Sequence, residues 1–264
     1  MIEARPSPST AFDPEATLNA AHRRVSSFER LVGSVPYEAK GILTSEMLFL
    51  VSAVGDYRPA KIVESGRARG QSTHLLALAF PETEIVSIER DPRSPDAAVA
   101  EERCRRFEHV ELAFGDAFVE LPRRVDPGDV VVIDGPKGWH AVRLAMELLE
   151  TRRPAAVFVH DCYQGQGERR FLERNVPGAF FSDRPAFSEA FARLDEPIFA
   201  AARREGFESW LPHHFDGQTQ ISYGPTYACL PWSEGGAFRR ARRRLPIAKT
   251  LSRVGRSLRK RVGS

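Results

Sequence analysis

The stretch from Lys61 to Pro92 constrains the fold more than any other part of the sequence. A short apolar run, Ile62-Val63, leads into the glycine-rich turn ESGRARGQS, and an apolar helix-like segment follows until Pro81. A second strand-like run, Glu84 to Ile88, ends on Glu89. This succession of strand, glycine-rich turn, helix, strand and acid is typical of the unit with which a doubly wound sheet binds a nucleoside.

Each part of this unit has a physical reason. Gly66 and Gly70 let the backbone turn sharply and approach a ligand without a Cβ in the way. Ser72 or Thr73 is expected to cap the helix whose amides face the same crevice. Glu89 follows the second strand, where a carboxylate can accept hydrogen bonds from both hydroxyls of a ribose.

The glycines spell E-x-G-x-x-x-G-x-S, which differs from the G-x-G-x-x-G of dinucleotide-binding proteins. This pattern resembles the first motif of class I S-adenosylmethionine-dependent methyltransferases. It is most similar to the catechol O-methyltransferase-like branch and to related sugar or antibiotic O-methyltransferases. The resemblance implies that Glu64, Gly66 and Ser72 line the methionine end of S-adenosylmethionine, with Gly70 in the same loop, and that Glu89 holds the ribose. The alternative is a turn that uses its glycines only for packing.

Further apolar runs predict a doubly wound, Rossmann-like α/β fold with a seven-stranded, mostly parallel sheet and helices on both faces. A continuous apolar run such as DVVVI is expected for a strand that is buried on both faces of a parallel sheet. The later strands are predicted at Val110–Phe114, Asp129–Ile133, Ala155–Val159, and at an antiparallel pair near Gly206–Leu211 and Gln220–Leu230. Residues 178–200 and 212–219 give no clear assignment.

The chain is predicted to consist of one methyltransferase domain, residues 1–236, and a basic tail, residues 237–264. Residues 1–12 are rich in Pro, Ser and Thr, a composition typical of disorder. Residues 13–57 are expected to form a helical cap. Its first helix starts at Asp13-Pro14-Glu15, and Thr44 is expected to cap a second helix that runs through Val54. In the family that the motif resembles, such helices commonly cover the cofactor pocket.

Five carboxylates follow five successive predicted strands: Glu64, Glu89, Asp116, Asp134 and Asp161. Ligands of open α/β sheets bind outside the carboxyl ends of the strands, so these residues are expected to line one site. Packing does not explain them, because unpaired buried acids are costly. The resemblance places Asp116 near the adenine amine, although a Gly-Asp turn also has purely local explanations.

Asp134 and Lys137 lie three residues apart in one loop. In catechol O-methyltransferase-like enzymes, an Asp after the fourth strand binds a divalent metal and a nearby Lys takes the hydroxyl proton, and these two residues match that spacing. The same enzymes place an Asp-Asn or Asp-Asp pair after the fifth strand, where this chain has Asp161-Cys162. Cysteine is a poor ligand for Mg²⁺, so a metal held by Asp134 and Asp161 is expected only if water completes its coordination. His160 is the alternative base, since its ordinary pKa is ~6.5.

The net charge of +3 hides an asymmetry. Residues 237–264 contain eleven Lys or Arg and no Asp or Glu, which leaves a net charge of −8 for the rest of the chain. From Pro246 onward, Ile247, Leu251, Val254 and Leu258 share one helical face, so this part resembles a basic amphipathic helix that binds an anionic membrane surface. The alternatives are a helix that docks on the domain or a disordered tail. The acidic body disfavours nucleic acid as a partner.

The N-terminus has no signal peptide, and no apolar run is long enough to span a bilayer. The three cysteines are widely spaced, which disfavours a disulfide framework or a zinc site. A cytoplasmic location, peripheral at the inner face of the membrane if the tail binds there, is therefore expected. The sequence is compatible with a homo-oligomer.

Two functions of different classes follow. The first is S-adenosylmethionine-dependent O-methylation of a small hydroxylated acceptor, such as a sugar or glycolipid precursor. The second is a catalytically inactive, methyltransferase-like binding protein that is tethered to the membrane surface. A nicotinamide dehydrogenase is disfavoured because G-x-G-x-x-G is missing.

Overall fold

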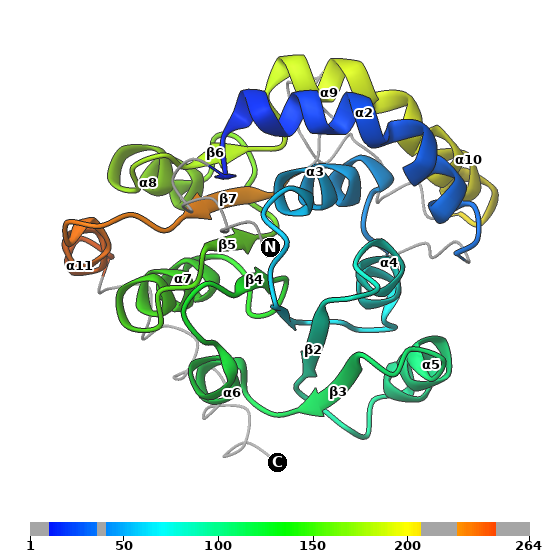
Figure 1. The fold of residues 1–264 in the computed structure, drawn as a ribbon, viewed down its shortest axis with the longest axis horizontal. Coiled ribbons are helices and arrows are strands. Elements are labelled where there is room, and N and C mark those ends of the chain that lie inside the picture. Colours follow the sequence, from blue (N-terminus) through cyan, green and yellow to red (C-terminus); the bar gives the residue numbers. More distant parts are fainter. Residues whose placement is uncertain (1–10, 36–40, 207–225, 247–264) are drawn as a thin grey trace, which may run out of the picture.

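A seven-stranded sheet lies at the centre of the protein (Figure 1). The computed structural model describes residues 11–35, 41–206 and 226–246. The strand order is β3-β2-β1-β4-β5-β7-β6, in which β1 to β5 are parallel and β7 is antiparallel to both of its neighbours. The strands are β1 (Lys61–Ser65), β2 (Glu84–Glu89), β3 (Val110–Phe114), β4 (Val130–Ile133), β5 (Ala156–Val159), β6 (Phe180–Phe181) and β7 (Ala228–Pro231). The predicted doubly wound, mostly parallel sheet is confirmed.

The position of the sixth strand differs from the prediction. Gly206 lies in a turn, and the rest of the predicted strand at 206–211 is outside the described residues. The sheet takes β6 from Phe180–Phe181 instead, within a stretch that the sequence left unassigned. A two-residue strand is too short to produce an alternating pattern, which is why the sequence does not reveal it. The last strand, β7, coincides with the end of the predicted 220–230 segment.

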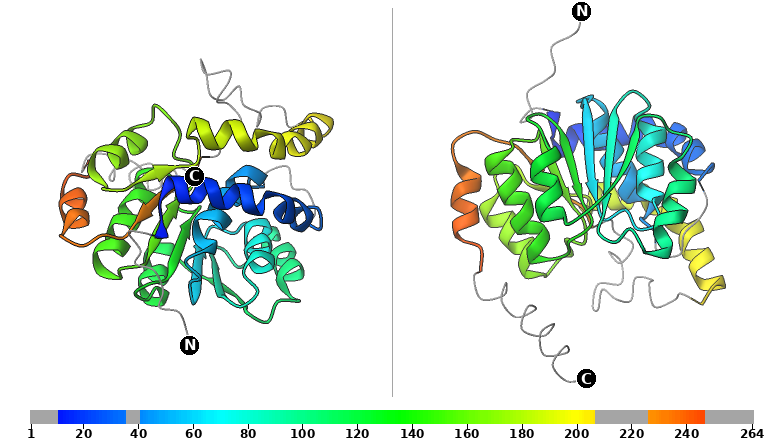
Figure 2. Two further views of the ribbon diagram at one scale, coloured as in Figure 1. Left: turned by 45° about the horizontal axis from the view of Figure 1, so that its top comes forward. Right: turned by 90° about the horizontal axis from the view of Figure 1, so that it is seen from below.

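Helices cover both faces of the sheet (Figures 1 and 2). One face carries α2 (Pro14–Val32), α3 (Thr44–Gly55), α4 (Gln71–Ala79), α5 (Pro95–Cys104), α9 (Pro185–Phe191), the 3₁₀ helix η1 (Ala192–Asp195) and α10 (Glu196–Arg204). The other face carries α6 (Ala117–Arg124), α7 (Trp139–Thr151), α8 (Gly167–Asn175) and α11 (Ala237–Arg243). Two separate apolar clusters, one for each face, pack these helices on the strands.

The predicted helical cap is formed by α2 and α3. Asp13 caps α2 as expected, because its carboxylate accepts hydrogen bonds from the amides of Glu15 and Ala16 at 2.9 Å. Helix α3 begins at Thr44, but Leu43 occupies the N-cap position, so the predicted capping role of Thr44 is wrong. Residues 44–54 are all buried, because α3 lies between α2 and the sheet (Figure 1).

Helix α11 is the described part of the predicted basic tail. Its apolar side chains, Phe238 and Ala241 among them, are buried in the cluster that contains α7. Arg239 and Arg242 pair with Glu150 of α7 at 3.2 and 3.1 Å. Helix α11 therefore docks on the domain, whereas the predicted basic amphipathic helix, residues 247–264, lies outside the described residues and stays a prediction. Within the described residues, no helix has the length and apolar character needed to cross a bilayer.

Candidate functional site

The register of the central strands brings the glycine-rich turn level with the ends of its neighbours. Ser65, the last residue of β1, is paired with Ile88 of β2 and with Ile133 of β4. The residues that follow these three positions are Gly66, Glu89 and Asp134. The five predicted carboxylates thus lie at the carboxyl edge of the sheet, and they form two groups, one around the glycine-rich turn and one around Asp134.

Gly66 and Gly70 both have backbone conformations that favour glycine. Gly66 has φ +89°, and a Cβ at this position would lie 2.4 Å from the amide nitrogen of Gly135. Gly70 has φ +75° and precedes α4, where a Cβ would lie 3.0 Å from the side chain of Ala100 in α5. Gly66 therefore permits contact between the loops after β1 and β4, whereas Gly70 permits close packing of α4 on α5.

Glu64 is fully buried and hydrogen-bonded. Its carboxylate accepts hydrogen bonds from the hydroxyls of Ser72 and Thr73 at 2.5 Å and of Ser87 at 2.6 Å. Burial raises the pKa of Glu64, and the three hydroxyl donors oppose that rise. The Ser72 and Thr73 side chains thus bind Glu64 and do not cap α4, for which no side-chain cap is formed. Glu64 of β1 thus connects the start of α4, which follows the glycine-rich turn, to β2.

Glu89 is half-buried beside the turn. One carboxylate oxygen accepts a hydrogen bond from the Ala68 amide at 3.0 Å, and the other accepts one from the Arg90 amide at 2.7 Å. Asp116 is exposed and caps α6, because its carboxylate accepts a hydrogen bond from the Phe118 amide at 2.8 Å. One Asp116 oxygen therefore has a local role as the helix cap. The contact of Asp116 with an adenine stays a prediction.

Arg67 is a residue of this turn that sequence reasoning missed. Its side chain is only 2% exposed, and its guanidinium donates hydrogen bonds to the carbonyls of Ser87 and Ala113 at 2.6 and 2.8 Å. The guanidinium also lies over the ring of Phe114, 4.5 Å from its centroid. Arg67 thus ties the turn to the ends of β2 and β3. An arginine in a glycine-rich turn is expected to be solvated, so the sequence contained no indication of this role.

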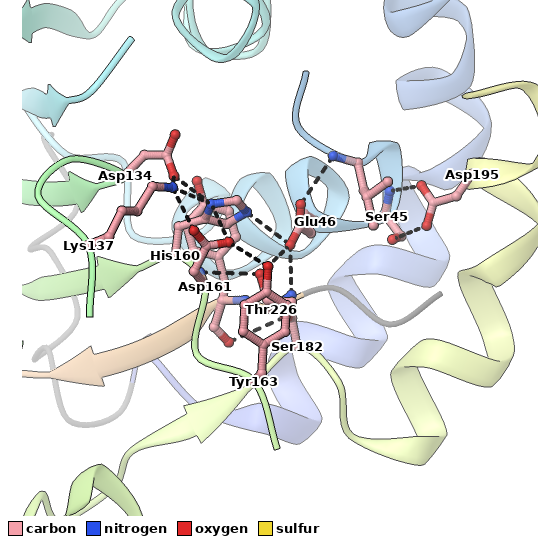
Figure 3. Close-up of polar contacts among 12 residues, drawn as sticks. Ser45, Glu46, Asp134, Lys137, His160, Asp161, Tyr163, Ser182, Asp195 and Thr226 are labelled. Carbon is pink, nitrogen blue, oxygen red and sulfur yellow. Dashed lines mark hydrogen bonds and ion pairs between the residues drawn. The ribbon is translucent and has the colours of Figure 1, made fainter. Parts of the chain in front are cut away.

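The second group consists of Asp134, Lys137, His160 and Asp161, which lie together after β4 and β5 (Figure 3). The Lys137 ammonium bridges Asp134 and Asp161, and it lies 2.8 Å from Asp161 Oδ2. His160 Nδ1 lies 2.5 Å from Asp134 Oδ1, and His160 Nε2 lies 3.1 Å from Glu46 Oε1. The structure therefore brings all four predicted residues together.

The charges in this group fix its protonation. Burial alone would lower the pKa of His160, but the carboxylates of Glu46 and Asp134 raise it well above its ordinary value. Burial would likewise lower the pKa of Lys137, but the carboxylates of Asp134 and Asp161 raise it. The two cations hold the pKa of Asp134 below its usual range despite its burial. At neutral pH the group therefore contains an imidazolium, an ammonium and ionised carboxylates.

Glu46 and Thr226 complete this group, and sequence reasoning missed both. Glu46 is 2% exposed and accepts hydrogen bonds from the amide and the hydroxyl of Thr226 at 2.7 and 2.8 Å. In the sequence, Glu46 reads only as an acid in the first turn of a helix, which favours the helix dipole. His160 and Thr226 lie 114 and 180 residues away from Glu46 in the sequence, so no local pattern indicates these two contacts.

Three side chains of this group have atoms that could ligate a metal ion. Asp134, His160 and Asp161 each offer a ligand atom, and these atoms lie within 4.8 Å of one another. However, the Lys137 ammonium already bridges the two carboxylates. The neighbouring Cys162 is buried, and burial raises the pKa of its thiol to about 12. A neutral thiol and a protonated imidazole are unsuitable for Mg²⁺, so the residues as arranged do not fit a magnesium site.

The protein is similar in structure to several solved methyltransferases, the class that its first motif resembles. One is an O-methyltransferase from Bacillus cereus in complex with SAH, with 20% identity and a TM-score of 0.44, over 62% of this chain and 81% of that chain. Another is a SAH-bound methyltransferase from Podospora anserina, with 17% identity and a TM-score of 0.45, over 82% and 88% of the two chains.

A third similar structure is an O-methyltransferase from Streptomyces achromogenes, involved in tomaymycin synthesis and solved in complex with SAM. It has 20% identity and a TM-score of 0.40, over 75% of this chain and 79% of that chain. No family model matches the sequence. The function therefore has to rest on the geometry of the site.

Proposed function

We propose that the protein is an S-adenosylmethionine-dependent O-methyltransferase that acts on a small hydroxylated acceptor. One observation carries this proposal: the glycine-rich turn contacts the loop of Asp134 and Lys137 directly. The amides of Asp134 and Gly135 both donate to the Ser65 carbonyl, at 2.9 and 3.0 Å, and the Ser65 hydroxyl donates to the Gly135 carbonyl at 2.5 Å. The glycine-rich turn and a cluster of polar, ionised groups therefore lie next to each other at the carboxyl edge of the sheet, as a transfer between two bound molecules requires.

The glycine-rich side fits S-adenosylmethionine. Gly66 lets the turn pack directly on the Gly135 backbone, and the half-buried carboxylate of Glu89 is fixed by two backbone amides. We assign Glu89 to the two ribose hydroxyls and Asp116 to the adenine amine. Glu64, Gly70 and Ser72 shape the turn around the methionine end. When bound, this cofactor supplies a methyl group on a positively charged sulfur, which is open to attack by an oxygen nucleophile.

The acceptor side orients a hydroxyl and manages its proton. Asp134 is about one-third exposed and Asp161 about one-quarter, so their carboxylates can accept a hydrogen bond from an acceptor hydroxyl. Lys137 is half exposed and carries a proton in the resting protein, because both carboxylates raise its pKa. To act as the base, Lys137 must first lose that proton. Both nitrogens of His160 contact carboxylates, so we assign His160 a positioning role.

The proposed acceptor class, a sugar or glycolipid precursor, follows from the resemblance of the first motif. The proposed methyl transfer uses no metal ion, because the Lys137 ammonium lies where a cation would bridge Asp134 and Asp161. The charge that a divalent cation would supply to this site is supplied by the ammonium.

Calorimetry with S-adenosylmethionine tests the cofactor assignment. Glu89→Ala should weaken binding by on the order of 2–3 kcal/mol, roughly 30- to 150-fold in Kd, because charge-assisted hydrogen bonds to the ribose are lost. Glu84→Ala is the matched control, since Glu84 is an exposed residue at the opposite end of the same strand. Equal affinity in wild type and Glu89→Ala would remove the ribose assignment. A wild-type protein that binds NADH and not S-adenosylmethionine would overturn the proposed function.

A further inference from the structure

The carboxylate of Glu46 is buried beside the acceptor group and makes more contacts than the packing of α3 requires. Oε1 faces three donors: the amide of Thr226, its hydroxyl, and Nε2 of His160. Oε2 accepts a hydrogen bond from the Leu43 amide at 3.1 Å. An ionised carboxylate in the core is costly unless it is paired and hydrogen-bonded, and an apolar residue would pack in α3 without that cost. The cost therefore indicates a function.

We propose that Glu46 is a positioning residue for methyl transfer, which acts through His160 and Thr226 to hold the acceptor-binding carboxylates in place. This inference rests on the proposed function for the reaction it serves, but its geometry is independent of that reaction. Glu46 comes from the helical cap, whereas Asp134 and Asp161 come from the sheet (Figure 3). It thus joins the cap to the site.

The first connection runs through the His160 ring. Glu46 holds Nε2, Asp134 holds Nδ1, and the ring of Tyr227 lies 4.9 Å away, centroid to centroid. With both nitrogens hydrogen-bonded and one face of the ring packed, the imidazole cannot rotate. Asp134 Oδ1 is thereby kept between His160 and Lys137. Loss of Glu46 would release one end of this arrangement.

The second connection runs through Thr226 to the turn after β5. The Asp161 amide donates to the Thr226 hydroxyl at 3.3 Å, and the Cys162 amide donates to the Thr226 carbonyl at 2.9 Å. Asp161 has φ +60°, a left-handed conformation that has a steric cost for a residue with a Cβ. The hydrogen bonds of Thr226 compensate for this cost and aim the Asp161 side chain at Lys137.

Asp195 of η1 provides a matched control, because it contacts the same first turn of α3. It is also a buried carboxylate, and it accepts hydrogen bonds from the amide and the hydroxyl of Ser45 at 2.9 and 2.5 Å. It has no recorded contact with His160 or Thr226 among the described residues. Asp195→Asn therefore alters a second buried carboxyl group beside the start of α3 without removing a contact to His160 or Thr226.

The experiment compares Glu46→Gln with Asp195→Asn in the full-length protein by NMR at fixed pH. A hydrogen-bonded imidazole proton exchanges slowly, so His160 should give a downfield N–H resonance, which His160→Gln identifies among the seven histidines. We expect Glu46→Gln to shift or abolish this resonance and Asp195→Asn to retain it. An unchanged resonance in Glu46→Gln overturns the proposal, whether or not the protein transfers methyl groups. Absence of methyl transfer with a Glu46-dependent resonance would instead refute the proposed function alone.

Kinetics then test whether Glu46 acts through His160. Glu46→Gln should lower kcat roughly 10- to 100-fold with the KM for S-adenosylmethionine nearly unchanged, because misplaced groups slow chemistry more than cofactor binding. The double variant with His160→Gln should be slower than His160→Gln alone by much less than the full effect of Glu46→Gln, because only the connection through Thr226 is then left to lose. Multiplying effects would overturn the proposal. If Glu46→Gln does not fold, Glu46→Asp, which keeps the charge but is one methylene shorter, carries the same two tests.

Discussion

Replacing Asp195 by asparagine should change how the stability of the fold depends on pH. Asp195 of η1 is fully buried against the first turn of α3. Burial raises the pKa of its carboxyl group from 3.8 to about 7, the hydrogen bonds from Ser45 oppose that rise, and the charge of Glu46 adds to it. The folded protein therefore keeps the Asp195 proton up to near-neutral pH, whereas the unfolded chain releases it near pH 3.8.

The sign and size of the effect follow from this difference. Between about pH 4 and pH 7 the folded state binds more protons than the unfolded state, so the free energy of unfolding falls as the pH rises. A pKa difference of about 3 units corresponds to a loss on the order of 4 kcal/mol, complete above pH 7. Asp195→Asn removes this loss but exchanges the hydrogen bonds of a carboxyl group with Ser45 for those of an amide, at a cost of about 1 kcal/mol. We therefore expect it to be near neutral at pH 5 and stabilising by roughly 2–3 kcal/mol at pH 8.

Urea unfolding of both proteins at pH 5 and pH 8 measures this difference directly. The midpoints should separate at pH 8 and nearly coincide at pH 5, with equal slopes in both proteins. Because each protein is its own control across pH, titrations elsewhere in the chain cancel. If the difference in unfolding free energy is the same at both pH values, Asp195 does not titrate between them and this reasoning fails.

Three further predictions concern the acceptor group and the tail. Lys137→Ala should abolish methyl transfer while cofactor affinity is retained. Because Asp134 and Asp161 raise the pKa of Lys137, the wild-type rate should still be rising at pH 9. If the rate instead reaches a plateau near pH 7, and His160→Gln removes that ionisation, the base is His160. Chelation with EDTA should leave the rate unchanged, since the ammonium already bridges both carboxylates, and a loss that Mg²⁺ restores would contradict this. Removing residues 247–264 should weaken co-sedimentation with anionic vesicles by ~1 kcal/mol per lost charge at low salt, and equal pelleting of both forms would show that this segment is not an anchor.

The carboxyl edge of the sheet could be predicted because its determinants are local. Each of β1 to β5 contains a short apolar run, and the acid at or just after its carboxyl end, from Glu64 to Asp161, is placed by the direction of a parallel strand alone. The two-residue strand β6 could not be predicted, because tertiary pairing with β7 defines it and periodicity does not.

The buried polar groups were beyond the reach of the sequence for a different reason. Glu46 and Arg67 belong to residue types that usually lie on the surface, and their burial depends on partners from distant segments. The protonation of the acceptor group also depends on distances. Lys137 could be placed near Asp134 by spacing, but the second contact with Asp161, which adds to the rise of the Lys137 pKa, required the fold.

The contact between Gly66 and Gly135 limits how variants of this protein can be made. A Cβ on Gly66 would meet the Gly135 backbone at 2.4 Å, and a Cβ on Gly135 would meet the Gly66 Cα at 3.2 Å. The Gly135 backbone therefore excludes a side chain at Gly66, a side chain at Gly135 would make a tight contact, and no pair of larger residues can compensate, because both contacts are with backbone atoms. A combinatorial library that seeks new acceptors should leave these two positions unchanged and vary the side chains that follow them, from Pro136 onward. Variants with larger residues at Gly66 or Gly135 would disturb the contact between these two loops.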